Sequence, residues 1–249
     1  MAAVAQTASV GEARRRLPRE FIESLSSTFP QPVAERILRG MGAPRRTTLR
    51  VNTVRSNAAE LMAFFRGKAV KHQRVAWYPD AFVLSDSSER DAREWEPYRE
   101  GRIYLQSLSS MIPALVLEPR PGERILDVAA APGSKTTQMA AMMGNTGSIL
   151  ANELDKVRSE RLAYNVKLQG CGIVEIRVGR GERLGGQMPD SFDKVLLDVP
   201  CSGEGRFIVF EPATSRPWSP RVVTECIRLQ KKLVASGVRA ARPGGVLVY

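Results

Sequence analysis

The apolar positions of the first hundred residues predict short helices followed by short strands. In residues 18–41, Phe21, Leu25 and Phe29 recur at helical spacing, and Pro32 suits the first turn of a second helix. The pattern therefore predicts two short helices before the first strand.

The segments that follow alternate in the manner of strands. Residues 47–55 and 74–85 predict strands, and residues 57–67 between them predict a helix with Asn57 as its N-cap. We therefore expect a small α+β domain over residues 17–100.

From residue 101 onward, predicted strands alternate with predicted helices. The strands cover residues 122–130, 147–154, 174–179, 192–199 and 244–249. This alternation favours an α/β fold with a parallel, doubly wound sheet over residues 101–249. Ligands of such sheets bind beyond the carboxyl ends of the strands, so the residues just after each strand are the candidates for function.

The net charge of the chain indicates which class of partner the protein binds. The formal net charge is +11 and the isoelectric point is about 10.1. Such a balance favours an anionic partner, with nucleic acid first and a membrane surface second, and a basic but inert surface is the alternative. No apolar run approaches the length of about 18 residues that a membrane span needs.

The cysteines and the first residues of the chain bear on metal binding and on the cellular compartment of the protein. Cys171, Cys201 and Cys226 lack CxxC spacing and His72 is the single histidine, so we expect no metal site. Sparse thiols suit a reducing compartment, and we expect a cytoplasmic protein. Residues 1–16 lack the apolar segment of a secretory signal; we expect a disordered basic tail, with a transit peptide as the alternative.

The loop after the first parallel strand is a candidate ligand site. Small residues over 129–133 let the backbone approach a ligand, and free amides of a helix that starts near Ser134 favour an anionic group. The loop is neither a GxGxxG fingerprint nor a phosphate-binding P-loop.

Glu153 ends the second parallel strand, where an acid is placed to accept hydrogen bonds from a ribose diol. A ribose-bearing ligand without a pyrophosphate fits both features, and S-adenosylmethionine is such a ligand. Taken alone, Glu153 is better explained as a helix N-cap or a solvated surface charge. Together with the small-residue loop one strand earlier, the ligand interpretation is favoured.

Two motifs carry a resemblance to a known family. "DVAAAPGSKT" and "LLDVPCSGEG", with "TTLRVN" and "RPGGVLVY", are similar to the Sun (Fmu) family of RNA cytosine-5 methyltransferases, which act on ribosomal or transfer RNA. The resemblance runs from about residue 17 to the last residue. It implies a Rossmann-like methyltransferase sheet preceded by a small α+β domain.

The resemblance also implies site residues. S-adenosylmethionine would be bound by Glu153, by Asp198, which lies near both cofactor and target base, and by the loop. The loop residues are Ala129, Ala130, Ala131, Pro132, Gly133, Ser134 and Lys135. Family members usually carry another acid after the third strand, near the adenine. Here Arg180 stands at that place with Glu182 nearby, which leaves the adenine contact open.

Methylation at carbon 5 of cytosine needs a nucleophile at carbon 6. A thiolate adds there, the methyl group transfers from the sulfonium to carbon 5, a base removes the carbon 5 proton, and the thiol leaves. Asp198 is the candidate acid near the ring's N3 and amino group. The resemblance implies that Cys201 assists release, whereas the attacking cysteine belongs to a Thr-Cys motif after the next strand.

The chain stops at Tyr249, at the end of that strand. Three interpretations follow: a piece of a longer enzyme, a truncated and inactive form, or a chain in which Cys201 attacks. A structural role for Cys201 as a loop thiol is a further alternative. Cys226 is predicted to be a core residue and Trp218 to be a packing residue.

We expect an S-adenosylmethionine-dependent enzyme that forms 5-methylcytosine in rRNA or tRNA, as a monomer without membrane contact. The alternatives are a methyltransferase for a small molecule or protein, and a truncated, non-catalytic module that binds RNA and the cofactor. An RNA face or a solvated surface would explain the arginines equally well. They are Arg14, Arg15, Arg16, Arg45, Arg46 and Arg50.

Overall fold

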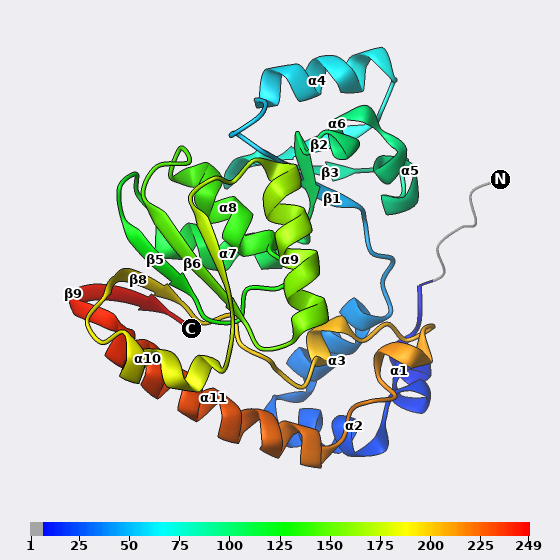
Figure 1. The fold of residues 1–249 in the computed structure, drawn as a ribbon. Coiled ribbons are helices and arrows are strands. Elements are labelled where there is room, and N and C mark those ends of the chain that lie inside the picture. Colours follow the sequence, from blue (N-terminus) through cyan, green and yellow to red (C-terminus); the bar gives the residue numbers. More distant parts are fainter. Residues whose placement is uncertain (1–6) are drawn as a thin grey trace. The chain divides into compact units, whose positions relative to one another are not determined.

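The computed structural model describes residues 7–249 and divides into two compact units (Figure 1). The first unit comprises Met1–Arg45 and Pro200–Gln230, and the second comprises Arg46–Val199 and Lys231–Tyr249. No helix in the described part is long and apolar enough to cross a membrane.

A five-stranded sheet forms the centre of the second unit. Its strands are β5 (Arg124–Asp127), β6 (Ser148–Glu153), β7 (Val174–Val178), β8 (Phe192–Leu196) and β9 (Ala241–Val248). The order is β7-β6-β5-β8-β9, and every adjacent pair is parallel. This confirms the predicted parallel α/β sheet. The chain leaves β5 on one side for β6 and later returns on the other side as β8, so the switch point lies beside β5.

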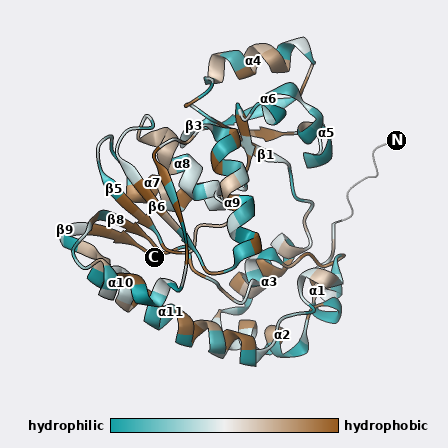
Figure 2. Ribbon diagram, in the orientation of Figure 1, coloured by the Kyte–Doolittle hydropathy of each residue, from teal (hydrophilic) through white to brown (hydrophobic). Residues whose placement is uncertain are grey.

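The central strands β5, β6 and β8 are buried because helices cover the sheet. The helices of this part are α7 (Leu108–Leu117), α8 (Ser134–Met142), α9 (Lys156–Gln169), α10 (Leu184–Gln187) and the second half of α11 (Pro220–Ala240), with the short helix η1 (Gly181–Arg183). Ile125, Ile149 and Leu196 are at most 1% exposed, and Met139 and Leu162 pack against them from α8 and α9. The apolar colour of the central strands in Figure 2 follows this burial.

A second sheet is antiparallel and small. It has the order β2-β3-β1-β4, from β2 (His72–Val75), β3 (Tyr78–Leu84), β1 (Thr48–Val51) and β4 (Ile103–Leu105). Three helices accompany it: α4 (Ala58–Gly67), α5 (Glu89–Glu94) and α6 (Glu96–Arg99). The small α+β domain is thus present. Its last strand lies beyond the predicted boundary after residue 100, because β4 completes the sheet by pairing with β1.

Hydrogen bonds to two asparagine side chains explain where α4 begins and where β1 ends. Asn57 caps α4 as predicted, and its side chain accepts a hydrogen bond from the backbone amide of Glu60 at 3.0 Å. The predicted strand over residues 47–55 stops at Val51, because Asn52 starts a turn in which its Oδ1 accepts from the amide of Val54.

The first unit gathers helices around the loop after β8. The helices α1 (Val10–Arg16), α2 (Arg19–Thr28) and α3 (Gln31–Met41) pack with η2 (Glu204–Arg206), η3 (Pro212–Thr214) and the first half of α11. Phe21 contacts Phe207 and Trp218 edge-on, at centroid distances of 5.1 and 5.7 Å. Trp218 is therefore a packing residue, as predicted.

The expected disordered tail over residues 1–16 is wrong for residues 10–16, which form α1. Ser9 and Glu12 make a reciprocal capping box at its start, and Ala13 is buried. Residues 1–6 of that expectation lie outside the described residues.

The two units do not follow a linear division at residue 100. The first unit combines two separate stretches of the chain, because residues 200–230, which follow β8, pack with the N-terminal helices. The division into residues 17–100 and 101–249 stays a prediction.

Candidate cofactor-binding and active site

Asp127 ends β5 and is buried at the switch point of the sheet. Its carboxylate accepts a hydrogen bond of 2.7 Å from the Thr136 hydroxyl on the first turn of α8. Burial raises the pKa of Asp127 to about 6, although the hydrogen bond from Thr136 and the charge of Lys135 act in the opposite direction. The acid therefore ties the end of the strand to the start of the helix.

The loop between β5 and α8 turns sharply at Gly133. This residue has φ of +99°, and a Cβ atom here would lie 2.8 Å from Cδ1 of Leu162 on α9. Only glycine meets both demands without a shift of the chain. No side chain of residues 7–249 caps α8, so its first-turn amides are free to bind a group with negative charge.

Glu153 is the buried acid at the end of β6, with 3% exposure. One of its oxygens accepts from the amide of Ala131 at 3.3 Å, and the other accepts from the amide of Asp155 at 3.1 Å. Arg158 contacts both the acid and the loop. Its guanidinium is 3.5 Å from the Glu153 carboxylate and 2.9 Å from the Ala131 carbonyl oxygen. The loop and the acid, which were predicted to act on one ligand, are thus in direct contact.

Asp198 lies two residues beyond β8, and Lys135 connects it to α8. The Lys135 ammonium is 2.7 Å from the Asp198 carboxylate and donates to the Ser110 hydroxyl, also at 2.7 Å. The Asp198 side chain is half exposed, whereas that of Lys135 is largely buried. The lysine therefore places Asp198, a predicted site residue, next to the helix that follows the small-residue loop.

In the segment after β7 the sequence departs from the family pattern, because Arg180 stands where an acid is usual. Arg180 is exposed and forms an ion pair with Glu182 at 3.0 Å. Partial burial acts to raise the pKa of Glu182, but its own backbone amide and Arg180 outweigh that effect and lower it. Gly181 between them packs so closely that a Cβ atom would lie 2.9 Å from Val128, the residue after β5. An ionised Glu182 thus stands near the loop that follows β5.

Cys201 belongs to the first unit, in the loop that the N-terminal helices hold. The thiol is exposed, as a reactive group must be. Around it, Glu204 accepts hydrogen bonds of 2.7 Å from the Ser202 hydroxyl and from the Trp218 indole nitrogen. Arg45 donates to the carbonyl oxygen of Gly205 at 3.1 Å. The loop is therefore held by polar contacts on both sides of its turn.

The other two thiols differ from Cys201. Burial raises the pKa of Cys171 to about 11, so this thiol stays protonated. Cys226, predicted to be a core residue, is only half-buried, so that prediction is wrong. Burial raises its pKa, with further contributions from Cys201 and Glu204. Neither is placed as an activated nucleophile.

Arg50, expected on an RNA face or a solvated surface, is in fact completely buried. Its guanidinium donates to the side chains of Gln106 and Thr137, both at 2.8 Å, and to the carbonyl oxygen of Ser134 at 3.2 Å. It therefore joins β1 to the first turn of α8. Arg14, Arg15, Arg16, Arg45 and Arg46 are exposed.

Sequence reasoning missed three members of this site: Asp127, Ser110 and Arg158. The sequence could have identified Asp127 as a site residue, because it is an acid at the end of an otherwise apolar strand. Ser110 and Arg158 had none, because their partners lie 25 and 27 residues away along the chain.

Comparison with known proteins gives two family matches. Residues 114–249 match the family described as 16S rRNA methyltransferase RsmB/F, and residues 17–89 match the ferredoxin-like domain of RsmF/B-like methyltransferases. The two matched ranges follow the two kinds of sheet seen in the fold.

Curated relatives extend over the same residues. Ribosomal RNA small subunit methyltransferase F of Shewanella amazonensis is 34% identical over 94% of this chain and 50% of its own length. The protein of the same name in Klebsiella pneumoniae is 36% identical over 93% of this chain and 50% of its own length. The chain thus spans about half the length of the curated relatives it matches.

Solved structures resemble the fold. A methyltransferase homolog protein from Pyrococcus horikoshii is 29% identical with a TM-score of 0.81, covering 96% of this chain and 75% of that one. NSun6 from Pyrococcus horikoshii, solved with SFG, is 21% identical with a TM-score of 0.83, covering 94% and 83%, and speaks for the fold alone. The family match covers more than half of the chain, and we conclude that this protein belongs to the RsmB/F family of 16S rRNA methyltransferases.

Proposed function

We propose that this protein is an S-adenosylmethionine-dependent RNA methyltransferase that forms 5-methylcytosine in rRNA or tRNA. One observation carries the proposal: Lys135, on the helix after the small-residue loop, is 2.7 Å from the Asp198 carboxylate. This ion pair supports the proposal that the cofactor loop and the candidate catalytic acid belong to one site at the carboxyl edge of the sheet. Family membership supports the same reaction.

The residues at this edge suit the cofactor. The uncapped first turn of α8 offers backbone amides to a carboxylate, and Glu153 is an acceptor for a ribose diol. Ala129, Ala130, Ala131, Pro132 and Gly133 lie in the loop that precedes α8, and the amide of Ala131 donates to Glu153. When bound, S-adenosylmethionine supplies an electrophilic methyl group. An acid for the adenine is best supplied by Glu182, because Arg180 carries the wrong charge for a hydrogen bond acceptor.

Asp198 acts on the target base in this proposal. Half exposed and held by Lys135, it is the group that contacts N3 and the exocyclic amine of cytosine while carbon 6 is attacked. A cytosine within a duplex is out of reach of such a site, so the target must be unpaired or flipped out.

Cys201 is assigned to release rather than to attack. Its exposure and its loop of small residues suit a thiol that approaches a covalent protein–RNA adduct. The assignment follows the family pattern, in which the attacking cysteine lies in a different segment.

Transfer of a labelled methyl group tests the reaction. A form of the protein that includes the segment with the attacking cysteine is incubated with methyl-tritiated S-adenosylmethionine and with ribosomal or transfer RNA, and the RNA is then digested to nucleosides. Tritium in 5-methylcytidine supports the proposal. Tritium in another nucleoside, in protein or in a small molecule contradicts it.

The cytoplasmic location and the monomeric state stay predictions. Gel filtration with light scattering tests the second of these, and a mass of about 27.5 kDa is the expected value.

A further inference from the structure

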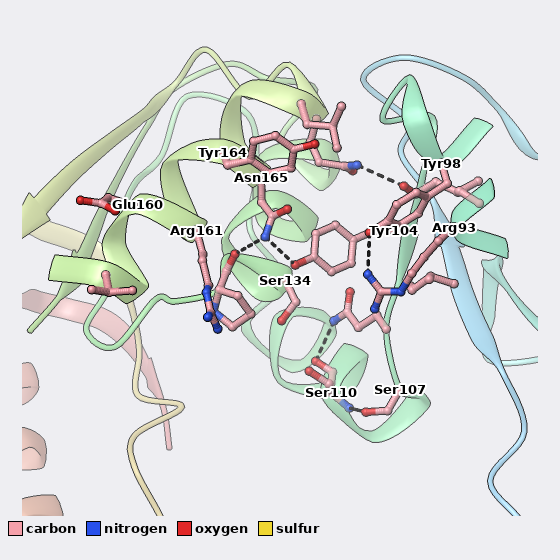
Figure 3. A pocket seen from close by; sticks show the side chains of 17 residues that line it. Arg93, Tyr98, Tyr104, Ser107, Ser110, Ser134, Glu160, Arg161, Tyr164 and Asn165 are labelled. Carbon is pink, nitrogen blue, oxygen red and sulfur yellow. Dashed lines mark hydrogen bonds between the residues drawn. The ribbon is translucent and has the colours of Figure 1, made fainter. Parts of the chain in front are cut away.

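A pocket of about 800 Å³ opens in the second unit beside the cofactor loop (Figure 3). Its walls come from three places: α9, the segment around β4, and the residues that start α8. Tyr104 projects into it, and its hydroxyl accepts a hydrogen bond of 3.3 Å from Asn165. The pocket combines aromatic rings with amide, hydroxyl and guanidinium groups, which is the chemistry that binds nucleotides.

The outer face of α9 forms one long side of this pocket. Val157, Arg161, Tyr164 and Leu168 follow one another at helical spacing and all line it. Val157 and Tyr164 are 60% and 66% exposed, whereas the opposite face of the helix is buried in the core. A solvated helix face would be polar instead, so this stripe is suited to a partner with apolar, stackable groups.

A second hollow of about 820 Å³ continues the first. It is lined by Tyr164 and Leu168 as well, and it adds Arg55 and Lys167. Tyr164 therefore stands on the ridge that the two hollows share. Together they make a groove along α9, which we call the α9 groove.

The α9 groove carries uncompensated positive charge. Within residues 7–249, Arg55, Arg161 and Lys167 have no ion-pair partner. Two acids also line the groove. Glu160 points away from the other labelled side chains of the pocket (Figure 3), and Glu100 forms an ion pair with Arg102 at 2.9 Å. Cations without partners beside an exposed aromatic ring match the alternation of phosphate and base in a single strand.

The α9 groove leads to the candidate catalytic acid. Ser110 and Ser134 both line the pocket. Lys135 follows Ser134 along the chain and donates to Ser110 while pairing with Asp198. One lysine thus separates the wall of the pocket from the acid assigned to the target base.

We propose that the α9 groove binds the unpaired RNA that adjoins the target cytosine. Tyr164 stacks on a flanking base, and Arg55, Arg161 and Lys167 contact its phosphates. The inference rests on the proposed function, and it adds where the RNA lies and which side chains hold it.

Binding of a single-stranded RNA tests this inference. The probe is a fluorescein-labelled 12-nucleotide RNA with one cytosine, and fluorescence anisotropy measures its affinity for the 249-residue protein. Tyr164→Ala is expected to weaken binding about five-fold to one hundred-fold, through loss of stacking. Arg161→Ala is expected to reduce the slope of log affinity against log salt by about 0.7.

Two matched variants control for general effects. Trp77→Ala removes an aromatic ring that is 51% exposed in the turn between β2 and β3. Arg120→Ala removes an exposed arginine just before β5, at the amino edge of the sheet. Both are expected to bind the probe like the parent. Because Tyr164 and Arg161 are exposed, their variants should keep the parent's circular dichroism and melting temperature.

Ultraviolet cross-linking locates the strand independently. With 5-bromouridine on either side of the cytosine, the cross-link should lie in the peptide that contains Arg161 and Tyr164. Equal affinity of Tyr164→Ala, Arg161→Ala and the parent, with cross-links elsewhere, overturns the α9 groove as an RNA site and leaves the proposed function standing. Occupation by a protein segment would produce that result. A parent protein that binds S-adenosylmethionine but no RNA overturns both.

Discussion

Glu153 accepts a hydrogen bond from the backbone amide of Ala131 at 3.3 Å. The acid that ends β6 therefore also fixes the loop that follows β5. A substitution at either place is expected to disturb both halves of the cofactor site.

Asp127 should make stability depend on pH. Its pKa is about 6 in the folded protein and 3.8 to 3.9 in an unfolded chain, so the folded state binds the proton more tightly. The stability contributed by this proton is complete below pH 4 and is lost as pH rises through 6. The loss amounts to about 3 kcal/mol.

Urea unfolding of the parent and of Asp127→Asn at pH 4 to 7.5 checks this. Asparagine can still accept the hydrogen bond from Thr136 but does not titrate. The free energy of unfolding of the parent relative to the variant should therefore fall with rising pH. A constant difference across this range would show that Asp127 titrates normally.

Much of the fold follows from the sequence because β5 and β6 are clear apolar runs, and Glu153 ends β6 at the place where a ligand-binding acid is expected. The proximity of the 129–135 loop and Glu153, which were predicted to bind one ligand, was predictable because the carboxyl ends of adjacent parallel strands meet. The burial of Arg50 was not predictable, because no feature of the neighbouring sequence distinguishes a buried arginine from an exposed one. Its burial depends on Gln106 and Thr137, 56 and 87 residues away.

Replacement of Gly133 by alanine should destabilise the loop between β5 and α8. The left-handed backbone costs about 1–2 kcal/mol with a side chain, and the added Cβ would press on Leu162. Denaturant unfolding should show a loss of at least that size, together with weaker cofactor binding. Gly186→Ala is the matched control, since an added Cβ there meets nothing within 4 Å. Equal stability of the two variants would refute the conformational argument.

RNA binding should weaken steeply with salt. Each phosphate that the protein neutralises adds about 0.7 to the slope of log affinity against log salt for a single strand. With a formal charge of +11, a slope that corresponds to several phosphates is expected between about 50 and 200 mM salt. Filter binding across that range measures it, and affinity that does not change with salt would remove the electrostatic basis of RNA binding.

Cys201→Ala should trap rather than abolish a covalent protein–RNA adduct. The physical reason is that a release group acts after the nucleophile has already bonded to carbon 6. The experiment uses a form of the protein that transfers methyl groups, and the adduct appears as a slow band on a denaturing gel. Cys226→Ala, which changes a half-buried thiol in the same unit, should leave the pattern of bands unchanged. If Cys201→Ala stops transfer and no adduct forms, Cys201 is the attacking thiol.

The most direct test of the cofactor site is a calorimetric titration with S-adenosylmethionine. The parent and Glu175→Gln, which changes an exposed acid on β7, should bind one equivalent with the same affinity. Glu153→Gln should bind more weakly by about 1–3 kcal/mol, because the ribose diol loses a charged acceptor. A parent that does not bind the cofactor, or a Glu153→Gln variant that binds it as tightly as the parent, would contradict the assignment of this site.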